Sequence, residues 1–413
     1  MERSTGKRAG AAVCALAALL GSAACSAERE EPFGGRAVIE VDRPVALVDE
    51  KVRIRVTGLA PGQEITVSAE TGSLHGDWRS RAVFRADGRG VVDLARAEPL
   101  RGTYGGADGM GLLWSMKAER KGVGSYRTEP PHQRPGLDVR LTVTGEGAEL
   151  AERTLTRVQM AEGVRHRELT ADEDGVAGTL YLPPEGAPKA APALVIGGSE
   201  GGESMRDVAA LLASRGHPAL SVCYFGCEGR PKELARIGLE YFAQAAGLLA
   251  RQHAADPGRL LVIGASRGSE PAQMLAQYHP GLVEDAVVYA SSNQVGDAVS
   301  VDHLHAWTVD GEPYTEEDVP LDRVRGRVLG IVGDEDGVWS SEYRSEAITE
   351  EEGNELLVYP RAGHFVAGHP YLPEQRTTYP VEGGGEIDTG GTRAGNARAK
   401  ADSWPRVLRL LRN

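Results

Sequence analysis

Cysteine is scarce in this chain, with only Cys14, Cys25, Cys223 and Cys227 among 413 residues. So few cysteines exclude the disulfide framework that holds many small secreted domains together. Cys223 and Cys227 lie close together, but no second cysteine pair or spaced histidine pair lies nearby to complete a zinc site. We therefore interpret them as two small residues at the end of a strand, in preference to half of a metal site or a redox pair.

Basic residues and aromatic residues are also few. The 46 Lys and Arg are outnumbered by 59 Asp and Glu, and the net charge of −13 disfavours binding of nucleic acid through a basic face. Aromatic residues make up 5% of the chain whereas glycine occurs 53 times, a balance that suits turn-rich strands. The other proportions, 41% hydrophobic and 25% charged, are those of a globular protein long enough for two or three domains.

Long apolar runs are absent except for one near the N-terminus. The apolar stretch of residues 11–24 follows three basic residues. It is too short to span a bilayer, but it has the length of the apolar region in a signal peptide. We expect residues 1–25 to be a signal peptide and residues 26–36 to be a linker to the folded part.

The end of this leader resembles a bacterial lipobox, in which a cysteine is acylated and becomes the new N-terminus. Small residues precede Cys25, although Ser22 stands where leucine is usual, three positions before the cysteine. Cleavage after a small residue with secretion, and an uncleaved anchor, therefore stay open as alternatives. We interpret the chain as an exported bacterial protein that is secreted, periplasmic or held at a membrane by a lipid anchor.

Residues 37–160 contain short alternating polar and apolar runs separated by turns. Residues 51–56 alternate in this way, a turn follows at residues 60–62, and residues 64–67 alternate again. Short strands at this spacing are typical of an antiparallel β-sandwich. We find no catalytic constellation in this part of the chain.

Apolar strands alternate with helical stretches over residues 165–413. The expected strands are residues 193–196, 219–222, 260–263, 286–289, 328–332 and 356–359, and the expected helices include residues 205–215 and 232–251. Continuous apolar strands separated by helices are typical of a mostly parallel sheet that helices cover on both faces. We therefore predict a doubly wound α/β domain preceded by an all-β sandwich.

The pattern G-x-S-x-G follows one of these strands. Ser266 lies at its centre, between Gly264 and Gly268, and the helix-compatible stretch of residues 272–278 follows. Between a strand and a helix the pattern is typical of a nucleophile elbow, in which a strained serine stands above the sheet and the glycines let strand and helix pack closely. We therefore predict that Ser266 is a catalytic nucleophile.

A base and an acid follow in the order expected of an α/β hydrolase. His364 lies in the loop after the last expected strand, where the histidine of a catalytic triad belongs. The loop after the preceding strand carries two aspartates, Asp334 and Asp336. Spacing alone does not choose between them.

An oxyanion hole needs two backbone N–H groups. One is expected from Arg267, directly after the nucleophile. The other is expected from Ser199 in the glycine-rich turn GGSEGG of residues 197–202, with Gly198 or Glu200 as alternatives. This turn lacks the G-K-[ST] ending of a phosphate loop and the spacing of a dinucleotide fingerprint. We expect the chemistry to need no metal ion and no organic cofactor.

Several motifs together point to one family, and two of them, residues 110–114 and the elbow with Glu270, are specific to that family rather than generic signals of a hydrolase. The motifs are residues 56–63 (VTGLAPGQ), 84–87 with 93–97, 109–116 (GMGLLWSM), 239–242 (LEYF), 264–270 (GASRGSE), 332–336 with Trp339, and 363–365. On these motifs the chain resembles the family of acyl-CoA thioesterases and bile acid-CoA:amino acid N-acyltransferases. The resemblance covers most of the mature chain and implies an immunoglobulin-like domain at residues 37–160 and an α/β-hydrolase domain at residues 165–413.

The resemblance also assigns individual residues. It implies that Asp336 is the acid of the triad, with Asp334 as the alternative. Glu270 matches a family glutamate that either orients the elbow or caps the helix, and we favour a structural role. Members that transfer acyl groups to amino acids carry a cysteine nucleophile whereas the thioesterases carry serine, so Ser266 favours hydrolysis over transfer to an amine.

The implied reaction is hydrolysis of acyl-CoA to a fatty acid and CoA, and the partner is a small-molecule acyl thioester or ester. Arg230, Lys232 and Arg236 could hold phosphates of CoA, but we interpret them as solvated helix charges. Export fits poorly with CoA thioesters, which are intracellular. An exported carboxylesterase acting on esters without CoA, or a catalytically inactive surface lipoprotein that binds lipid, therefore stays open.

Residues 382–397 form a glycine-rich segment between the expected base and the last helix. The segment contains the run Gly383-Gly384-Gly385. We expect a surface loop here, with a flap over the site as the alternative.

Overall fold

The computed structural model describes residues 36–296, 304–375, 377–380 and 385–412. The predicted signal peptide, the lipid anchor at Cys25 and nearly all of the predicted linker lie outside these residues. Within the described ranges, no helix combines the length and the apolar character needed to cross a membrane.

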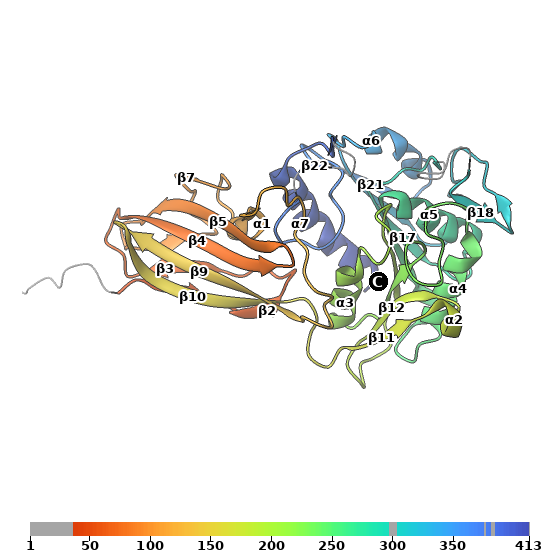
Figure 1. Ribbon diagram of the computed structural model, residues 1–413, viewed down its shortest axis with the longest axis horizontal. Helices are drawn as coiled ribbons and strands as arrows, with labels where there is room; N and C mark the ends of the chain where they lie inside the picture. The colour runs from red at the N-terminus through yellow and green to blue at the C-terminus, as the bar shows by residue number, and fades with distance from the viewer. Residues whose placement is uncertain (1–35, 297–303, 376, 381–384, 413) are drawn as a thin grey trace, which may run out of the picture.

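Two β-sheets packed face to face form the N-terminal part of the structure (Figure 1). The smaller sheet has the order β1 (Val38–Val41), β3 (Ile54–Thr57) and β6 (Val92–Asp93). The larger has the order β2 (Val45–Leu47), β10 (Ala148–Val158), β9 (Gly136–Gly145), β4 (Glu64–Ser73), β5 (Gly76–Arg85) and β7 (Arg101–Gly102), and β8 (Lys117–Ala118) pairs with β5. All pairings are antiparallel except that of β2 with β10. Because side chains alternate along each strand, Ile54 and Val56 of one sheet share a core with Val67 and Val143 of the other.

An eight-stranded sheet organises the C-terminal part. Its order is β11 (Arg165–Leu169), β12 (Ala177–Leu182), β14 (Ala219–Cys223), β13 (Ala193–Ile196), β16 (Leu261–Ala265), β17 (Asp285–Tyr289), β20 (Val328–Gly333) and β21 (Glu355–Tyr359). The pairings of β12 with β11 and with β14 are antiparallel, and all others are parallel. The carboxyl ends of the parallel strands therefore meet at one edge of the sheet, where ligand sites of open α/β sheets form.

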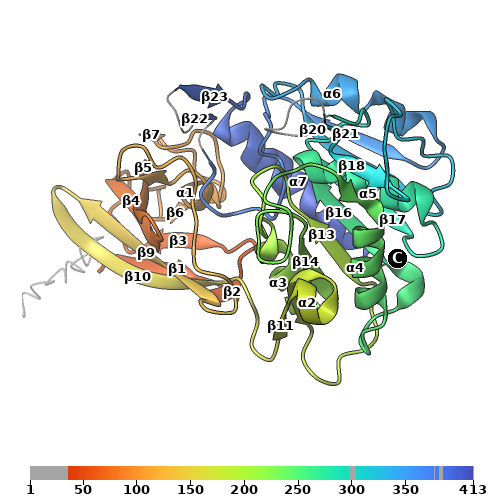
Figure 2. The same cartoon turned by 45° about the vertical axis from the view of Figure 1, so that its right-hand side comes forward.

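Helices cover both faces of this sheet (Figure 2). Ala193 and Val195 of β13 pack with α3 (Arg206–Ser214) and α7 (Arg393–Leu410), whereas Leu194 and Ile196 pack with α4 (Leu239–Ala250) and α5 (Ser269–Tyr278). Burial of both faces explains why the strand is a continuous apolar run. The short elements are α2 (Ala171–Asp174), α6 (Ser341–Arg344), β15 (Ile237–Gly238), β18 (Trp307–Val309), β19 (Glu312–Pro313), β22 (Thr378–Pro380) and β23 (Glu386–Asp388). The fold is the predicted α/β hydrolase preceded by an immunoglobulin-like sandwich.

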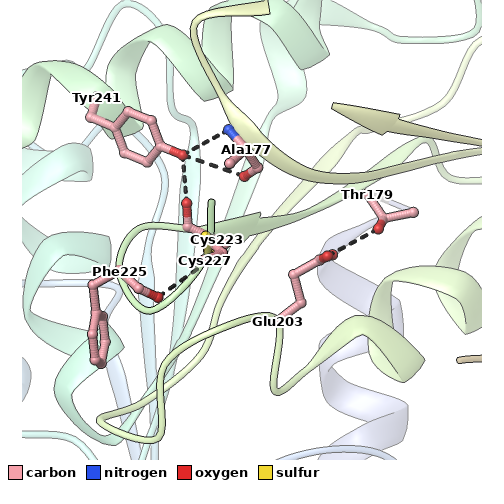
Figure 3. Close-up of a disulfide and its surroundings, with 7 residues drawn as sticks. All are labelled: Ala177, Thr179, Glu203, Cys223, Phe225, Cys227 and Tyr241. Carbon is pink, nitrogen blue, oxygen red and sulfur yellow. Dashed lines mark hydrogen bonds between the residues drawn. A yellow bond between two sulfur atoms is a disulfide. The ribbon is translucent and has the colours of Figure 1, made fainter. Parts of the chain in front are cut away.

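Two sequence expectations differ from the structure around β14. The helix expected over residues 232–251 begins only at Leu239, because Arg236 has a left-handed backbone with φ +51° and Ile237–Gly238 pairs with β18. The interpretation of Cys223 and Cys227 as unlinked small residues is wrong. The two form a disulfide that closes the turn after β14, with their Cα atoms 6.6 Å apart (Figure 3).

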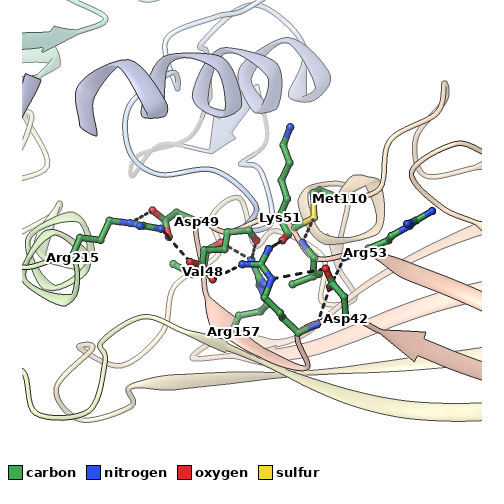
Figure 4. Close-up of polar contacts among 11 residues, drawn as sticks. Asp42, Val48, Asp49, Lys51, Arg53, Met110, Arg157 and Arg215 are labelled. Carbon is green, nitrogen blue, oxygen red and sulfur yellow. Dashed lines mark hydrogen bonds and ion pairs between the residues drawn. The ribbon is translucent and has the colours of Figure 1, made fainter. Parts of the chain in front are cut away.

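A buried carboxylate joins the two parts of the molecule (Figure 4). Asp49 of the sandwich accepts two hydrogen bonds from the guanidinium of Arg215, at 2.6 and 2.7 Å, and a third at 2.6 Å from the indole of Trp404 in α7. The buried Arg157 of β10 donates to the carbonyls of Val48 and Glu50, on either side of Asp49. A second joint lies near α1 (Gly111–Trp114), where the guanidinium of Arg393 in α7 donates to the carbonyls of residues 114–116.

This joint generates a prediction about stability. Replacing Asp49 with Ala leaves Arg215 and the Trp404 N–H without their buried acceptor, and loss of one partner of a buried pair costs about 3 kcal/mol of unfolding free energy. Urea unfolding followed by circular dichroism measures this loss. Glu64→Ala, which removes an exposed partner of Arg85, is the matched control and is expected to leave the midpoint unchanged. Equal midpoints for both variants would contradict the assignment of Asp49 as the joint.

Candidate active site

Ser266 lies at a strained turn between β16 and α5. Its backbone has φ +52°, in the left-handed region that side chains other than glycine seldom adopt. The two flanking glycines are required by close backbone contacts. A Cβ built on Gly264 would lie 2.2 Å from the carbonyl oxygen of Gly268, and one built on Gly268 would lie 2.2 Å from that of Gly197. The turn therefore has the geometry of a nucleophile elbow, with Ser266 at its centre.

Ser266, His364 and Asp336 are linked by hydrogen bonds, although they come from three different strand ends. Ser266 Oγ lies 2.9 Å from His364 Nε2, and His364 Nδ1 lies 2.8 Å from Asp336 Oδ2. With the imidazole proton on Nδ1, that nitrogen donates to the carboxylate and Nε2 accepts the serine hydroxyl. The serine can then lose its proton to a base that the carboxylate orients.

The acid side chain is fully buried and heavily hydrogen-bonded. Asp336 Oδ1 accepts from the backbone N–H groups of Val338 and Trp339, at 2.9 and 3.4 Å, and Oδ2 also accepts from the hydroxyl of Ser341. Asp334, the alternative acid, is exposed and instead accepts at 2.7 Å from the backbone N–H of Arg361. The structure thus brings Asp336 to the histidine and keeps Asp334 at the surface.

Residues 386–392 differ from the surface loop that the sequence suggested. Glu386–Asp388 forms β23, and Arg393 already begins α7. The carbonyl of Thr389 accepts from the N–H of His364 at 2.8 Å and from that of Gly337 at 3.3 Å. Gly390 forms a β-bridge with Asp336. The segment is therefore packed against the loops that carry the acid and the base, while residues 382–384 lie outside the described residues.

The turn of residues 197–202 lies beside the nucleophile. A Cβ built on Gly198 would lie 3.2 Å from Ser266 Cβ and 2.6 Å from a carboxylate oxygen of Glu200. Ser199 and Glu200 are exposed, whereas Gly198 is buried. The alternatives for the second oxyanion donor thus remain within one short turn, and Arg267 directly follows Ser266 in the elbow.

A buried ion pair links the turn at Ser266 to the first turn of α5. Glu270 in the first turn of α5 lies 3.0 Å from the guanidinium of Arg267 and accepts at 2.5 Å from the indole N–H of Trp307. Burial is the largest influence and raises the pKa of Glu270 to about 7, against the opposing effects of Arg267 and Trp307. Sequence reasoning missed Trp307, because it lies 37 residues further along the chain and carries no motif.

Two further residues adjoin the proposed triad: Trp339, which belongs to one of the motifs but was given no role, and Ser341, which sequence reasoning missed. The ring of Trp339 meets that of His364 edge to face at 5.1 Å, and Ser341 donates to Asp336. The nearness of both to Asp336 in the sequence was the available signal. Of the basic residues considered for CoA, Lys232 and Arg236 are exposed and Arg230 stacks over the ring of Tyr241 at 3.5 Å. Among the described residues, no cluster of three or more His, Cys, Asp or Glu could hold a metal ion.

Comparison with known proteins places both parts of the chain. Residues 49–171 match the family model of the acyl-CoA thioester hydrolase/BAAT N-terminal region, and residues 300–413 match that of the BAAT/acyl-CoA thioester hydrolase C terminal. The second match includes Asp336 and His364, whereas Ser266 lies between the two.

Curated relatives align over nearly the whole length. Acyl-coenzyme A thioesterase 1 of Homo sapiens is 30% identical over 87% of this chain and 92% of its own, and mitochondrial acyl-coenzyme A thioesterase 2 of Homo sapiens is 30% identical over 87% and 80%. Among solved structures, a putative dienelactone hydrolase from Klebsiella pneumoniae aligns with 60% of this chain and 99% of its own, at 20% identity and a TM-score of 0.43.

The contrast between the two aspartates gives a prediction. Asp336→Asn removes the charge that orients and stabilises the imidazolium, so we expect kcat to fall about 10³-fold or more. Asp334→Asn, the matched control in the same loop, should change kcat by less than about twofold because its partner is a backbone N–H away from the imidazole. Steady-state kinetics on a p-nitrophenyl ester measures both. A larger loss for Asp334→Asn would reverse the assignment.

The buried glutamate gives a prediction about pH. A carboxyl whose folded pKa lies above its unfolded value of 4.5 binds its proton more tightly in the native state, so its contribution to stability falls as pH rises from about 4.5 to about 7. Relative to Glu270→Gln, the wild type should therefore lose about 3 kcal/mol of unfolding free energy across this window. Urea unfolding at pH 5 and pH 8 measures the difference. A difference that stays constant, or that grows in favour of the wild type at high pH, would contradict the raised pKa.

Proposed function

The chain belongs to the acyl-CoA thioester hydrolase/BAAT family, and we propose that it hydrolyses acyl thioesters by way of an acyl-enzyme on Ser266. The observation that carries the proposal is the hydrogen-bonded row Ser266–His364–Asp336 on a nucleophile elbow. The curated relatives are named acyl-coenzyme A thioesterases, which supports acyl-CoA as the substrate class. A serine in the nucleophile position favours release of the acid to water over transfer to an amine.

The first half-reaction forms the acyl-enzyme. Ser266 Oγ attacks the acyl carbonyl carbon while His364 Nε2 takes the hydroxyl proton. The carbonyl oxygen becomes an oxyanion that the N–H groups of Arg267 and Ser199 stabilise. When the carbon–sulfur bond breaks, the imidazolium returns the proton to the leaving thiolate, and the acyl group stays as an ester on Ser266.

The second half-reaction returns the enzyme. A water molecule loses a proton to His364 Nε2 and attacks the serine ester, which gives a second oxyanion in the same hole. The carbon–oxygen bond to Ser266 then breaks, and the imidazolium reprotonates the serine as the carboxylic acid leaves. Asp336 keeps its charge throughout and stabilises each imidazolium. Every proton transfer in this scheme passes through His364 Nε2, while the backbone N–H groups of the oxyanion hole stabilise the two tetrahedral intermediates.

A second candidate substrate class follows from the disulfide. Disulfides persist in oxidising compartments, and the Cys223–Cys227 bond therefore supports our proposal that the protein is exported. CoA thioesters are confined to the cell interior, so an exported enzyme with this triad would act on carboxylic esters or on thioesters without CoA. The catalytic steps are the same for both classes, and only the leaving group differs.

A matched substrate series separates these functions. Purified mature protein and Ser266→Ala are assayed on acyl-CoA and p-nitrophenyl esters of equal chain length. We expect hydrolysis by the wild type to exceed that by Ser266→Ala by about 10³-fold or more, with acyl-CoA preferred. Turnover of the simple esters alone would instead identify an exported carboxylesterase.

The remaining outcomes test two other functions, a catalytically inactive lipoprotein and an acyltransferase. If the wild type matches Ser266→Ala on every substrate, the proposal is wrong, and the alternative of a catalytically inactive lipoprotein that binds lipid is favoured. Addition of glycine or taurine to the same reaction, with mass spectrometry of the products, detects any amide. Amide as the main product would identify an acyltransferase despite the serine.

A further inference from the structure

The hydroxyl of Tyr224 lies under the glycine-rich turn beside the nucleophile, and the catalytic scheme above does not use it. Tyr224 Oη lies 3.0 Å from the carbonyl oxygen of Gly197 and 2.8 Å from that of Gly198, and it donates its one proton between them. The residue directly follows β14 and is completely buried. A buried hydroxyl that contacts two successive carbonyls fixes the orientation of two successive peptide units.

The direction of these carbonyls determines where the neighbouring N–H groups point. In a trans peptide the C=O and the N–H of one unit point in opposite directions. The carbonyl of Gly197 belongs to the same unit as the N–H of Gly198, and the carbonyl of Gly198 to the same unit as the N–H of Ser199. Because both carbonyls face Tyr224, both N–H groups face away from it on one common side, an arrangement that binds anions.

The turn also lies against the nucleophile. Gly198 is close enough to Ser266 for a built Cβ to lie 3.2 Å from the serine Cβ. The turn that carries the two N–H groups therefore lies next to Ser266, where an oxyanion donor is needed.

Tyr224 is itself held rigidly. Its ring packs against Phe242 and Trp307, with centroids 5.4 and 5.9 Å away. The disulfide from Cys223 to Cys227 (Figure 3) closes a ring of five residues. By its position in the sequence, Tyr224 is one of the five.

The far end of the turn is tied to the same ring. The N–H of Gly202 donates to the carbonyl of Phe225 at 3.0 Å. Burial also raises the pKa of Tyr224 well above its ordinary range, so the hydroxyl keeps its proton and stays a donor. The turn of residues 197–202 is thus docked at both ends on a cross-linked segment.

We propose that Tyr224 is a positioning residue of the oxyanion hole, which holds the Gly198 and Ser199 N–H groups toward the acyl oxygen at Ser266. The inference rests on the proposed acyl-enzyme chemistry on Ser266, and it makes Tyr224 act on the transition state through the backbone. Its removal should therefore weaken the binding of tetrahedral species and leave the binding of planar ligands unchanged.

The test compares Tyr224→Phe with Tyr241→Phe. Tyr241 is a matched control because its buried hydroxyl also contacts backbone groups, those of Ala177 and Cys223, but not the glycine-rich turn. For Tyr224→Phe we expect kcat on a p-nitrophenyl ester to fall about 10- to 100-fold with KM changed less than about twofold. For Tyr241→Phe we expect the thermal midpoint to fall and kcat to stay within about twofold.

A ligand pair supplies a readout that a purely structural role would not move. Affinity for an alkyl boronic acid, which forms a tetrahedral adduct with Ser266, should fall in Tyr224→Phe by the same factor as kcat. Affinity for the planar product fatty acid should stay unchanged. Equal effects of the two variants on kcat, or an equal loss of affinity for both ligands, would overturn the proposal.

A second measurement covers the case in which Tyr224→Phe does not fold. With 3-fluorotyrosine placed at 224, the ¹⁹F resonance should shift when the boronic acid binds, and it should not shift in the Ser266→Ala background. If the ¹⁹F resonance does not shift when the adduct forms, the proposal is wrong. Binding of the boronic acid needs no turnover, so this test is independent of the substrate assays. If the wild-type protein binds the boronic acid but hydrolyses neither acyl-CoA nor esters, the proposed function is wrong. The role of Tyr224 can still be measured from boronic acid binding in that case.

Discussion

The left-handed backbone of Ser266 is the constraint on which the site depends. Such a conformation costs about 1–3 kcal/mol, and it persists only where the surroundings impose it. Here they do so through contact between backbones: the carbonyl of Gly268 occupies the space beside Gly264, and the carbonyl of Gly197 occupies the space beside Gly268. The same contacts that strain the serine thus bring the glycine-rich turn to within reach of it. The positions of Ser266 and of the turn that we propose for the oxyanion hole therefore result from one packing arrangement.

The rest of the site is placed by the parallel sheet. Adjacent strands β20 and β21 end at the same edge, which brings Asp336 and His364 together although 28 residues separate them. The segment that contains Thr389 then fastens both loops with backbone hydrogen bonds. The α7 helix follows this segment, and its Trp404 and Arg393 donate hydrogen bonds to the N-terminal sandwich. The same helix therefore adjoins both the loops of Asp336 and His364 and the N-terminal part.

The sequence sufficed for features that depend on local pattern. Strand 193–196 and the elbow at Ser266 were predictable because continuous apolar runs and a G-x-S-x-G motif each have one dominant structural explanation. Local pattern alone could not choose between Asp334 and Asp336, since both follow the same strand. The family resemblance implied Asp336, and Asp336 is the aspartate whose side chain contacts His364. The packing of Thr389, the role of Asp49 and the Tyr224 contacts depend on residues far apart in the chain, for which no local pattern exists.

The disulfide was missed for a related reason. Two cysteines four residues apart form a bond only if the turn between them folds back, and the sequence around Tyr224 does not specify that turn. The bond matters because it lies in the same segment that supports the oxyanion turn. The disulfide also bears on the substrate. It is compatible with the proposed export of the protein, and an exported enzyme would not meet CoA thioesters, which are intracellular.

In the proposed reaction the acyl group passes through an ester on Ser266. Rapid acid quenching of the wild type with a long-chain acyl-CoA or p-nitrophenyl ester, followed by peptide mass spectrometry, tests it directly. We expect the peptide containing Ser266 to gain the mass of the acyl group within the first turnover, and we expect no such gain in Ser266→Ala. Product formation by the wild type with no acylated peptide at any quench time, or acylation at another residue, would contradict it.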